Sequence, residues 1–201
     1  MKKIILASAS PRRREILENL GFRFDIVVSG TDETKLSCDI EPKLYVQEMA
    51  LLKASEAGKA IGKSKDTILI SADTIVLIDG EILGKPKDEE DAFSMLSKLS
   101  GREHEVITGF CVMDLGSGAA VSKAEVTRVE FKDLSPEIIK SYIASGEPMD
   151  KAGSYGIQGK GGILVKKIDG DYFNVVGLPV SGLTDVLIND FSLRFENGIW
   201  K

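Results

Sequence analysis

Hydroxyl and basic side chains gather in the stretch SASPRRR close to the amino terminus of the chain. A helix start already carries partial positive charge from unpaired N–H groups, so arginines there are unfavourable unless an anion lies nearby. The hydroxyls of Ser8 and Ser10 can donate to the oxygens of a phosphate group. The guanidinium groups of Arg12 and Arg13 can bind the same oxygens as forked donors. The stretch therefore indicates an anion site, and a capped surface helix whose arginines pair with nearby glutamates is the alternative.

An aspartate, Asp73, interrupts the apolar stretch LISADTIVLI. A carboxylate among apolar neighbours is unfavourable unless it is paired or bound to a metal, so its presence favours a functional role. Binding of Mg²⁺, activation of a water molecule, or both would suit it. A capping or turn aspartate is the alternative, but the flanking isoleucine and valine side chains disfavour a turn.

Three further charged residues could join such a site, namely Glu33 in GTDETK, Lys53, and Lys85 in ILGKPKD. Each of them taken alone is typical of a solvated surface. Lys85 is the strongest candidate, because Gly84 and Pro86 favour a tight turn that would hold its amine in place.

The stretch DKAGSYGIQGKGG is rich in glycine, which permits close approach of the backbone to a ligand. Within it, Gln158 offers both a donor and an acceptor that could read the edge of a base. A flexible loop is the alternative. Two apparent nucleotide motifs fail, because AGKAIGKSK is one residue short of a Walker loop and GIQGKGG lacks the dinucleotide-binding pattern.

The elements that must position these residues alternate between strands and helices. Helix starts are indicated by Ser10 with Pro11, by Asp88, and by Ser135 with Pro136, and Asp79 with Gly80 indicates a hairpin turn. The predicted helices cover residues 11–20, 42–61, 88–99, 136–146 and 179–191. The predicted strands cover residues 3–7, 24–30, 67–83 with the Asp79-Gly80 turn inside that stretch, 105–115 and 119–134, and a hairpin is predicted over residues 163–177.

Length, composition and charge narrow the class of protein. The chain has 201 residues, of which 43% are hydrophobic and 28% charged, and this is ordinary for a globular protein. Its formal net charge of -5 argues against a general nucleic-acid binder, because such proteins display basic surfaces. No apolar run approaches the roughly 20 residues that span a bilayer, so we expect a cytoplasmic protein without a membrane contact.

The few cysteine and histidine residues argue against a disulfide, a zinc site and a Ser-His-Asp triad. Cys38 and Cys111 are isolated, so neither a disulfide nor a zinc site is indicated. His104 is the only histidine, which leaves little material for a Ser-His-Asp triad, and we expect it to be exposed. No linker separates two domains, so residues 1–190 are predicted to form a single domain. Residues 191–201 are expected to form a loosely held tail, although Trp200 within this tail could dock locally.

Several of these stretches occur together in a known order. LASASPRRREIL, SADTIV with LGKPKD, and DKAGSYGIQGKGG with VVGLP resemble the Maf family of nucleoside triphosphate pyrophosphatases, also called septum formation inhibitors. The resemblance extends from Lys3 to about Asn189. It implies an α/β fold related to the inosine triphosphate pyrophosphatases (Maf/Ham), with a mixed elongated sheet, flanking helices and a cleft between two lobes.

The resemblance also implies an activity and a cofactor. The activity is hydrolysis of a nucleoside triphosphate between the alpha and beta phosphates, with a divalent cation such as Mg²⁺, Mn²⁺ or Co²⁺. The proton-accepting aspartate of the family falls on Asp73. The phosphate-handling and metal-linked positions fall on Ser8, Ser10, Arg13, Glu33, Lys53 and Lys85. Positions that set base preference in the dTTP/UTP branch fall on Arg12, Thr74 and Gln158.

Taken together, these observations favour a catalytic function. We expect Asp73, Lys53, Lys85 and Arg13 to be catalytic and Glu33 and Asp73 to hold the metal. The remaining matched residues are expected to bind a small-molecule nucleoside triphosphate, with dTTP, UTP or a modified pyrimidine as the substrate in nucleotide-pool housecleaning. The alternative is a nucleotide-binding regulator of cell division without turnover, and a homodimer is compatible with the family.

Overall fold

The computed structural model describes residues 2–28, 30–31, 36 and 40–201 of the chain. These residues form two compact units, which are described separately below. Unit 1 comprises Met1–Asp73, Thr108–Glu125 and Gly177–Lys201, and unit 2 comprises Thr74–Ile107 and Val126–Val176. Within the described ranges, no helix is both long enough and apolar enough to cross a membrane.

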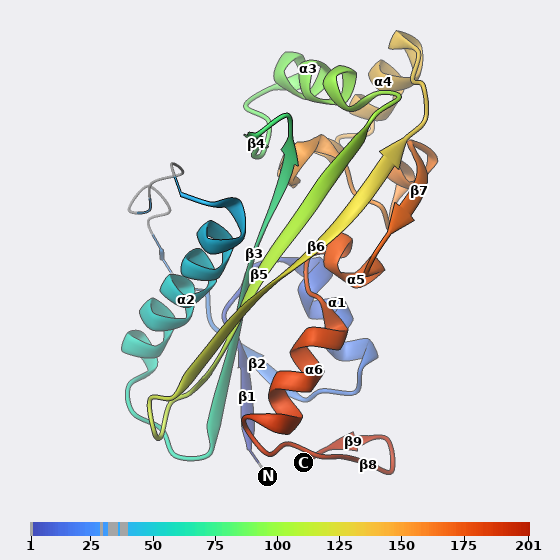
Figure 1. The fold of residues 1–201 in the computed structure, drawn as a ribbon. Helices are drawn as coiled ribbons and strands as arrows, with labels where there is room; N and C mark the ends of the chain where they lie inside the picture. The colour runs from blue at the N-terminus through green and yellow to red at the C-terminus, as the bar shows by residue number, and fades with distance from the viewer. Residues whose placement is uncertain (1, 29, 32–35, 37–39) are drawn as a thin grey trace. The chain divides into compact units, whose positions relative to one another are not determined.

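A mixed seven-stranded sheet contributes strands to both units, in the order β2-β1-β3-β5-β6-β7 with β4 paired to β3 (Figure 1). Strand β1 is parallel to both β2 and β3, whereas β4 is antiparallel to β3 and β7 is antiparallel to β6. The strands are β1 Lys3–Leu6, β2 Phe24–Ile26, β3 Thr67–Ile78, β4 Glu81–Leu83, β5 Glu103–Asp114, β6 Ala120–Phe131 and β7 Val165–Asp169. The predicted mixed α/β class is confirmed.

The described residues of unit 1 include the helices α1 Pro11–Asn19, α2 Pro42–Ile61 and α6 Val180–Asn189. Helix α2 begins where the side chain of Glu41 accepts a hydrogen bond from Leu44 N, at 2.9 Å. It ends at Gly62, whose φ of 83° is a conformation that glycine adopts readily. The predicted bounds of α2 are confirmed.

Helices cover both faces of the sheet in unit 1 (Figure 1). Consecutive residues of a strand point to opposite faces. Gly109 of β5 lies so close to α2 that a Cβ there would overlap the Val46 carbonyl. The next residue, Phe110, packs on Gly182 of α6, where an added Cβ would lie 3.3 Å from its ring. Helices α2 and α6 therefore sandwich the strand between them.

The carboxyl-terminal residues of unit 1 form a short hairpin of β8 Phe195–Glu196 and β9 Ile199–Trp200. The Trp200 ring stacks on Phe22 with a centroid distance of 4.5 Å. Its indole N–H donates to Leu20 O at 3.0 Å. Trp200 thus docks locally as the sequence suggested, and the tail is held by packing rather than loosely. The boundary at residue 190 stays a prediction.

Unit 2 contains α3 Glu89–Leu99, α4 Pro136–Ile143 and α5 Tyr172–Val176. The predicted starts of the first two helices are confirmed, because Asp88 accepts from Asp91 N at 2.8 Å and Ser135 accepts from Ile138 N at 3.4 Å. Their apolar faces pack into a core with the strands of this unit, including Leu96, Ile139 and Phe131.

The predicted hairpin over residues 163–177 is wrong. Strand β7 pairs with β6 instead, and the following residues form helix α5. Asp171 accepts from Phe173 N at 2.7 Å, which favours a helix start. The buried side chain of Asn174 donates to Val106 O and to Thr127 Oγ1, each at 3.0 Å. These long-range bonds hold a segment whose local pattern resembles a strand.

The second predicted strand, expected over residues 24–30, is shorter in the structure and covers Phe24–Ile26.

The prediction that His104 is exposed is also wrong. The residue is 2% exposed and lies edge-on to the rings of Phe131 and Tyr155. Its Nε2 lies 2.8 Å from the Tyr155 hydroxyl, and burial lowers the pKa of His104 to about 4. His104 is a residue of β5, and the sequence alone did not reveal which face of that strand would be buried.

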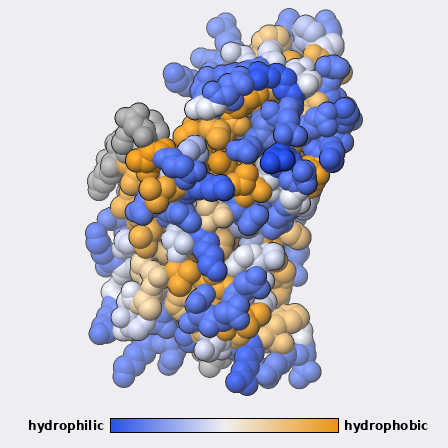
Figure 2. Space-filling model, in the orientation of Figure 1, coloured by the Kyte–Doolittle hydropathy of each residue, from blue (hydrophilic) through white to orange (hydrophobic). Residues whose placement is uncertain are grey.

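Hydrophilic side chains cover most of the face drawn in Figure 2, with smaller apolar areas among them. Such scattered apolar exposure is normal for a folded protein. The thiol of Cys111 is buried, which raises its pKa to about 12 and leaves it unreactive. Cys38 lies outside the described residues.

Candidate active site

Arg13 joins three segments of unit 1 through its guanidinium group. Its Nη1 donates to Ser8 Oγ at 3.1 Å and to Ala72 O at 2.8 Å. Its Nε donates to Gly177 O at 2.8 Å. A planar guanidinium can satisfy several acceptors at once in a fixed geometry. Arg13 therefore fixes the loop after β1, the middle of β3 and the residues ahead of α6 relative to one another.

Asp73 and Lys53 form an ion pair within unit 1, with 2.7 Å between Lys53 Nζ and Asp73 Oδ1. Their side chains are only 15% and 14% exposed, respectively. An ion pair with so little exposure is strengthened by the reduced dielectric, and removal of one partner leaves the other charge poorly solvated. Asp73 thus has the charged partner that its apolar surroundings require.

The register between α2 and β3 explains why these two residues meet. The buried hydroxyl of Ser71 donates to Ala50 O at 2.6 Å, which fixes β3 against α2. Asp73 lies two residues after Ser71 and so points to the same face of the strand. Lys53 lies three residues after Ala50 and so lies on the same side of the helix. A small-residue helix face at Ala50 and Ala54, both 0% exposed, lets the strand approach closely.

The loop between β1 and α1 contains Ser8 and Ser10, which the sequence predicts to bind phosphate. Ser8 Oγ accepts from Ser10 N at 3.2 Å as well as from Arg13. Ser10 occupies the N-cap position of α1, but its side chain makes no capping hydrogen bond within the described part of the chain. The first turn of α1 holds no acidic residue. Its N–H groups and its dipole are therefore suited to an external anion.

The alternative explanation of the arginine stretch applies to one arginine. Arg14 Nε donates to Glu18 at 2.7 Å, and both side chains are exposed. Arg13 instead donates to two backbone carbonyls and a hydroxyl. Arg12 is half-buried in the first turn of the same helix. Surface pairing thus accounts for Arg14, whereas Arg13 is part of an internal cluster.

The structure describes Ser8, Ser10, Arg12, Arg13, Lys53 and Asp73 in unit 1, and Thr74, Lys85 and Gln158 in unit 2. Lys85 and Gln158 are both exposed. The backbone links their segments, because Gly153 N donates to Gly84 O at 3.0 Å. The predicted turn at Lys85 is therefore tied to the glycine-rich loop.

The predicted metal ligands are only partly described. Glu33 lies outside the described residues, and Asp73 belongs to unit 1. Among the residues that the structure does describe, no group of three or more His, Cys, Asp or Glu side chains is arranged to hold a metal ion. The Asp73 carboxylate has the oxygen chemistry that Mg²⁺ and Mn²⁺ prefer. Of the two predicted metal ligands, the described residues thus supply only Asp73, whose carboxylate is chemically suited to a divalent cation.

Sequence reasoning missed Glu147, whose carboxylate accepts hydrogen bonds from the glycine-rich loop of unit 2. A signal was present, because an acidic residue preceded by Gly146 and followed by Pro148 stands just ahead of that loop. Nothing local indicated which amides it would bind.

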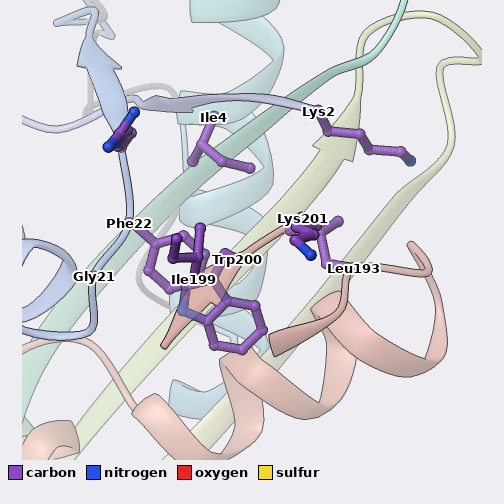
Figure 3. A pocket seen from close by; sticks show the side chains of 9 residues that line it. Lys2, Ile4, Gly21, Phe22, Leu193, Ile199, Trp200 and Lys201 are labelled. Carbon is purple, nitrogen blue, oxygen red and sulfur yellow. The ribbon is translucent and has the colours of Figure 1, made fainter. Parts of the chain in front are cut away.

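A separate cavity of about 270 Å³ lies beside the carboxyl-terminal hairpin of unit 1 (Figure 3). The stacked rings of Phe22 and Trp200 form part of its wall. The other lining residues are Lys2, Ile4, Gly21, Arg23, Leu193, Ile199 and Lys201. This cavity includes none of the predicted site residues.

Comparison with known proteins places the chain in a class. The family model described as Maf-like protein matches residues 3–189, and the chain belongs to this family. A dTTP/UTP pyrophosphatase of Caldanaerobacter subterraneus subsp. tengcongensis is 51% identical over 193 residues, which cover 96% of this chain and 91% of the relative. A dTTP/UTP pyrophosphatase of Alkaliphilus metalliredigens is 51% identical over 194 residues, covering 96% of this chain and 99% of that protein.

More distant likenesses were found among solved structures. The Staphylococcus aureus Ham1 protein superposes with a TM-score of 0.44 and 18% identity, covering 66% of this chain and 73% of that one. A HAM1 protein from Coxiella burnetii gives a TM-score of 0.42 and 18% identity, covering 65% of this chain and 73% of that one.

Proposed function

We propose that this protein is a nucleoside triphosphate pyrophosphatase that hydrolyses dTTP and UTP to the monophosphate and pyrophosphate. The Lys53–Asp73 ion pair and the guanidinium of Arg13 carry this proposal, because a little-exposed carboxylate is paired with one cation and a second cation is fixed on the carbonyl of the preceding residue, Ala72. The names of relatives that are about half identical over nearly the whole chain support it. A role in nucleotide-pool housecleaning follows from that activity.

In the proposed mechanism, Asp73 orients a water molecule and accepts its proton. Lys53 holds the carboxylate through the 2.7 Å ion pair, so the carboxylate is positioned before substrate binds. Arg13 and the start of α1 stabilise negative charge on the phosphates. Lys85 adds positive charge for the departing pyrophosphate. Asp73 together with Glu33 would hold a divalent cation such as Mg²⁺, Mn²⁺ or Co²⁺, which when bound neutralises the triphosphate.

Base preference in this proposal depends on Arg12, Thr74 and Gln158. Uracil and thymine present an N–H donor between two carbonyl acceptors, and a primary amide such as that of Gln158 can pair with both kinds of group. A base with a different edge leaves these groups unpaired, which lowers its affinity. The cytoplasmic location and the homodimer stay predictions.

The test is a panel of dTTP, UTP, CTP, dATP and GTP, each assayed with Mg²⁺, Mn²⁺ and Co²⁺. Products are separated by chromatography, so that monophosphate with pyrophosphate is distinguished from diphosphate with phosphate. We expect monophosphate and pyrophosphate, formed fastest from dTTP and UTP. Equal rates with GTP and UTP would contradict the base preference. Nucleotide binding without any hydrolysis would instead favour the alternative, a regulator of cell division.

A further inference from the structure

The carboxylate of Glu147 is the centre of a hydrogen-bond network inside unit 2. Its Oε2 accepts from Lys160 N at 2.9 Å, and its Oε1 accepts from Gly161 N at 3.1 Å. Its Oε1 also accepts from the Tyr142 hydroxyl at 3.0 Å. A single side chain therefore binds two consecutive backbone amides of the loop that follows Gln158.

The network also reaches the other side of that loop. Tyr142 is buried on α4, and its hydroxyl oxygen accepts from Gly156 N at 3.1 Å. Lys151 Nζ donates to the backbone carbonyl of Glu147 at 2.6 Å. Residues on both sides of Gln158 are thus fixed, one side directly by Glu147 and the other through Tyr142.

The ionised form of Glu147 suits this network. Burial by itself raises the pKa of Glu147, but the amides of Lys160 and Gly161, the Tyr142 hydroxyl and the nearby Lys151 ammonium together lower it. A carboxylate without its proton has only acceptors, and the surrounding amide and hydroxyl groups donate to it. Glu147 therefore stays charged at neutral pH.

Glycines in the loop leave room for the carboxylate. A Cβ added at Gly159 would lie 2.5 Å from Glu147 Oε2 and 2.7 Å from its carboxyl carbon. A Cβ added at Gly161 would lie 2.6 Å from the Tyr142 hydroxyl oxygen. Close packing against Glu147 and Tyr142 thus explains the glycines at positions 159 and 161.

Gln158 lies between these fixed residues, and its side chain is exposed. We propose that Glu147 is a positioning residue for base selectivity, because it holds the loop so that the Gln158 amide meets the edge of a uracil or thymine ring. This inference rests on the proposed function. Glu147 itself does not touch the substrate and acts through the loop backbone.

The first test compares Glu147→Gln with wild type. The substitution keeps the length of the side chain but replaces one acceptor oxygen by an NH₂ group that faces an N–H donor. We expect the ratio of kcat/KM for UTP to that for CTP to fall about tenfold, through a higher KM for UTP, with kcat changed by less than about threefold. Loss of folded protein would lower kcat for both nucleotides alike and leave the ratio unchanged.

Matched variants separate charge from position. Glu137→Gln removes the same charge from the exposed first turn of α4 and should leave the ratio as in wild type. Gly159→Ala keeps the Glu147 charge but displaces its carboxylate, and should lower the ratio as Glu147→Gln does. In Gln158→Ala, adding Glu147→Gln should lower the ratio no further, because both changes remove the same contact.

Hydrogen exchange supplies a measurement that does not depend on turnover. In Glu147→Gln we expect the amides of Lys160 and Gly161 to exchange at least about tenfold faster than in wild type, while those of α3 are unchanged. Faster exchange with an unaltered UTP/CTP ratio would overturn the inference and leave the proposed function standing. Unaltered exchange would overturn it as well. If wild type hydrolyses no triphosphate, the proposed function fails and the selectivity role falls with it.

Discussion

The cluster around Asp73 in unit 1 and the loop around Glu147 in unit 2 are held together in opposite ways. In unit 1 the charged side chains are themselves fixed, Lys53 and Asp73 by their ion pair and Arg13 by two backbone carbonyls. In unit 2 the backbone is fixed by one carboxylate, and the side chain of Gln158 is left exposed. The first arrangement suits chemistry that needs preset charges, and the second suits recognition of a ligand edge.

Asp73→Asn gives the largest expected effect and tests the unit 1 half of this comparison. Removal of a group that stabilises a transition state commonly costs about 3 to 4 kcal/mol, so kcat for UTP should fall by roughly a hundredfold or more. The control is Asp79→Asn, which removes an exposed carboxylate paired with Arg102 and should leave kcat within about twofold. Near-normal turnover in Asp73→Asn would remove this residue from the catalytic role.

His104 gives unit 2 a stability that depends on pH. Its folded pKa of about 4 lies below its ordinary value of 6.5, so the unfolded state takes up the proton first as the pH falls. Its contribution to the free energy of unfolding is complete above pH 6.5 and is lost as the pH falls toward 4, by about 3 kcal/mol in all.

Urea unfolding of wild type and His104→Gln between pH 7 and pH 4 measures this effect. The carboxylates titrate in both proteins, so the difference between the two pH profiles isolates the histidine. We expect wild type to lose about 3 kcal/mol more than the variant. Parallel profiles would show that His104 is not buried in its neutral form.

Arg13→Lys is expected to have a smaller effect on turnover than Asp73→Asn. The substitution keeps the charge but loses the planar fork that binds Ser8, Ala72 and Gly177. We expect kcat/KM for UTP to fall roughly thirtyfold, which corresponds to a loss of about 2 kcal/mol of transition-state stabilisation. Arg14→Lys, on the exposed side of the same helix, is the matched control. Equal values for the two variants would mean that the hydrogen bonds of Arg13 do not position the site.

Local sequence signals predicted most elements because their ends are set by adjacent residues. Asp88 and Ser135 cap helices in the structure. Asp79 and Gly80 form the turn that connects the antiparallel strands β3 and β4. Helix α5 was missed because its anchor, Asn174, bonds to groups 68 and 47 residues away. Contacts between residues so far apart in the chain produce no periodic pattern of hydrophobic residues in the sequence.

The candidate site was predictable by residue type but not by arrangement. A lone carboxylate in an apolar strand singled out Asp73, and its pairing with Lys53 became evident only from the register of α2 on β3. Glu147 was missed because its role depends on the path of the loop backbone. Gly177 contributes a carbonyl to Arg13, and a backbone acceptor has no signature in the sequence.

The docked Trp200 gives the molecule a built-in optical probe. It is the only tryptophan in the chain, and it stacks on Phe22 at the carboxyl-terminal end of unit 1. Intrinsic fluorescence excited at the red edge of the indole band therefore reports on unit 1 alone, whereas circular dichroism reports on both units. A denaturation followed by both signals would reveal whether the two units melt together or in sequence.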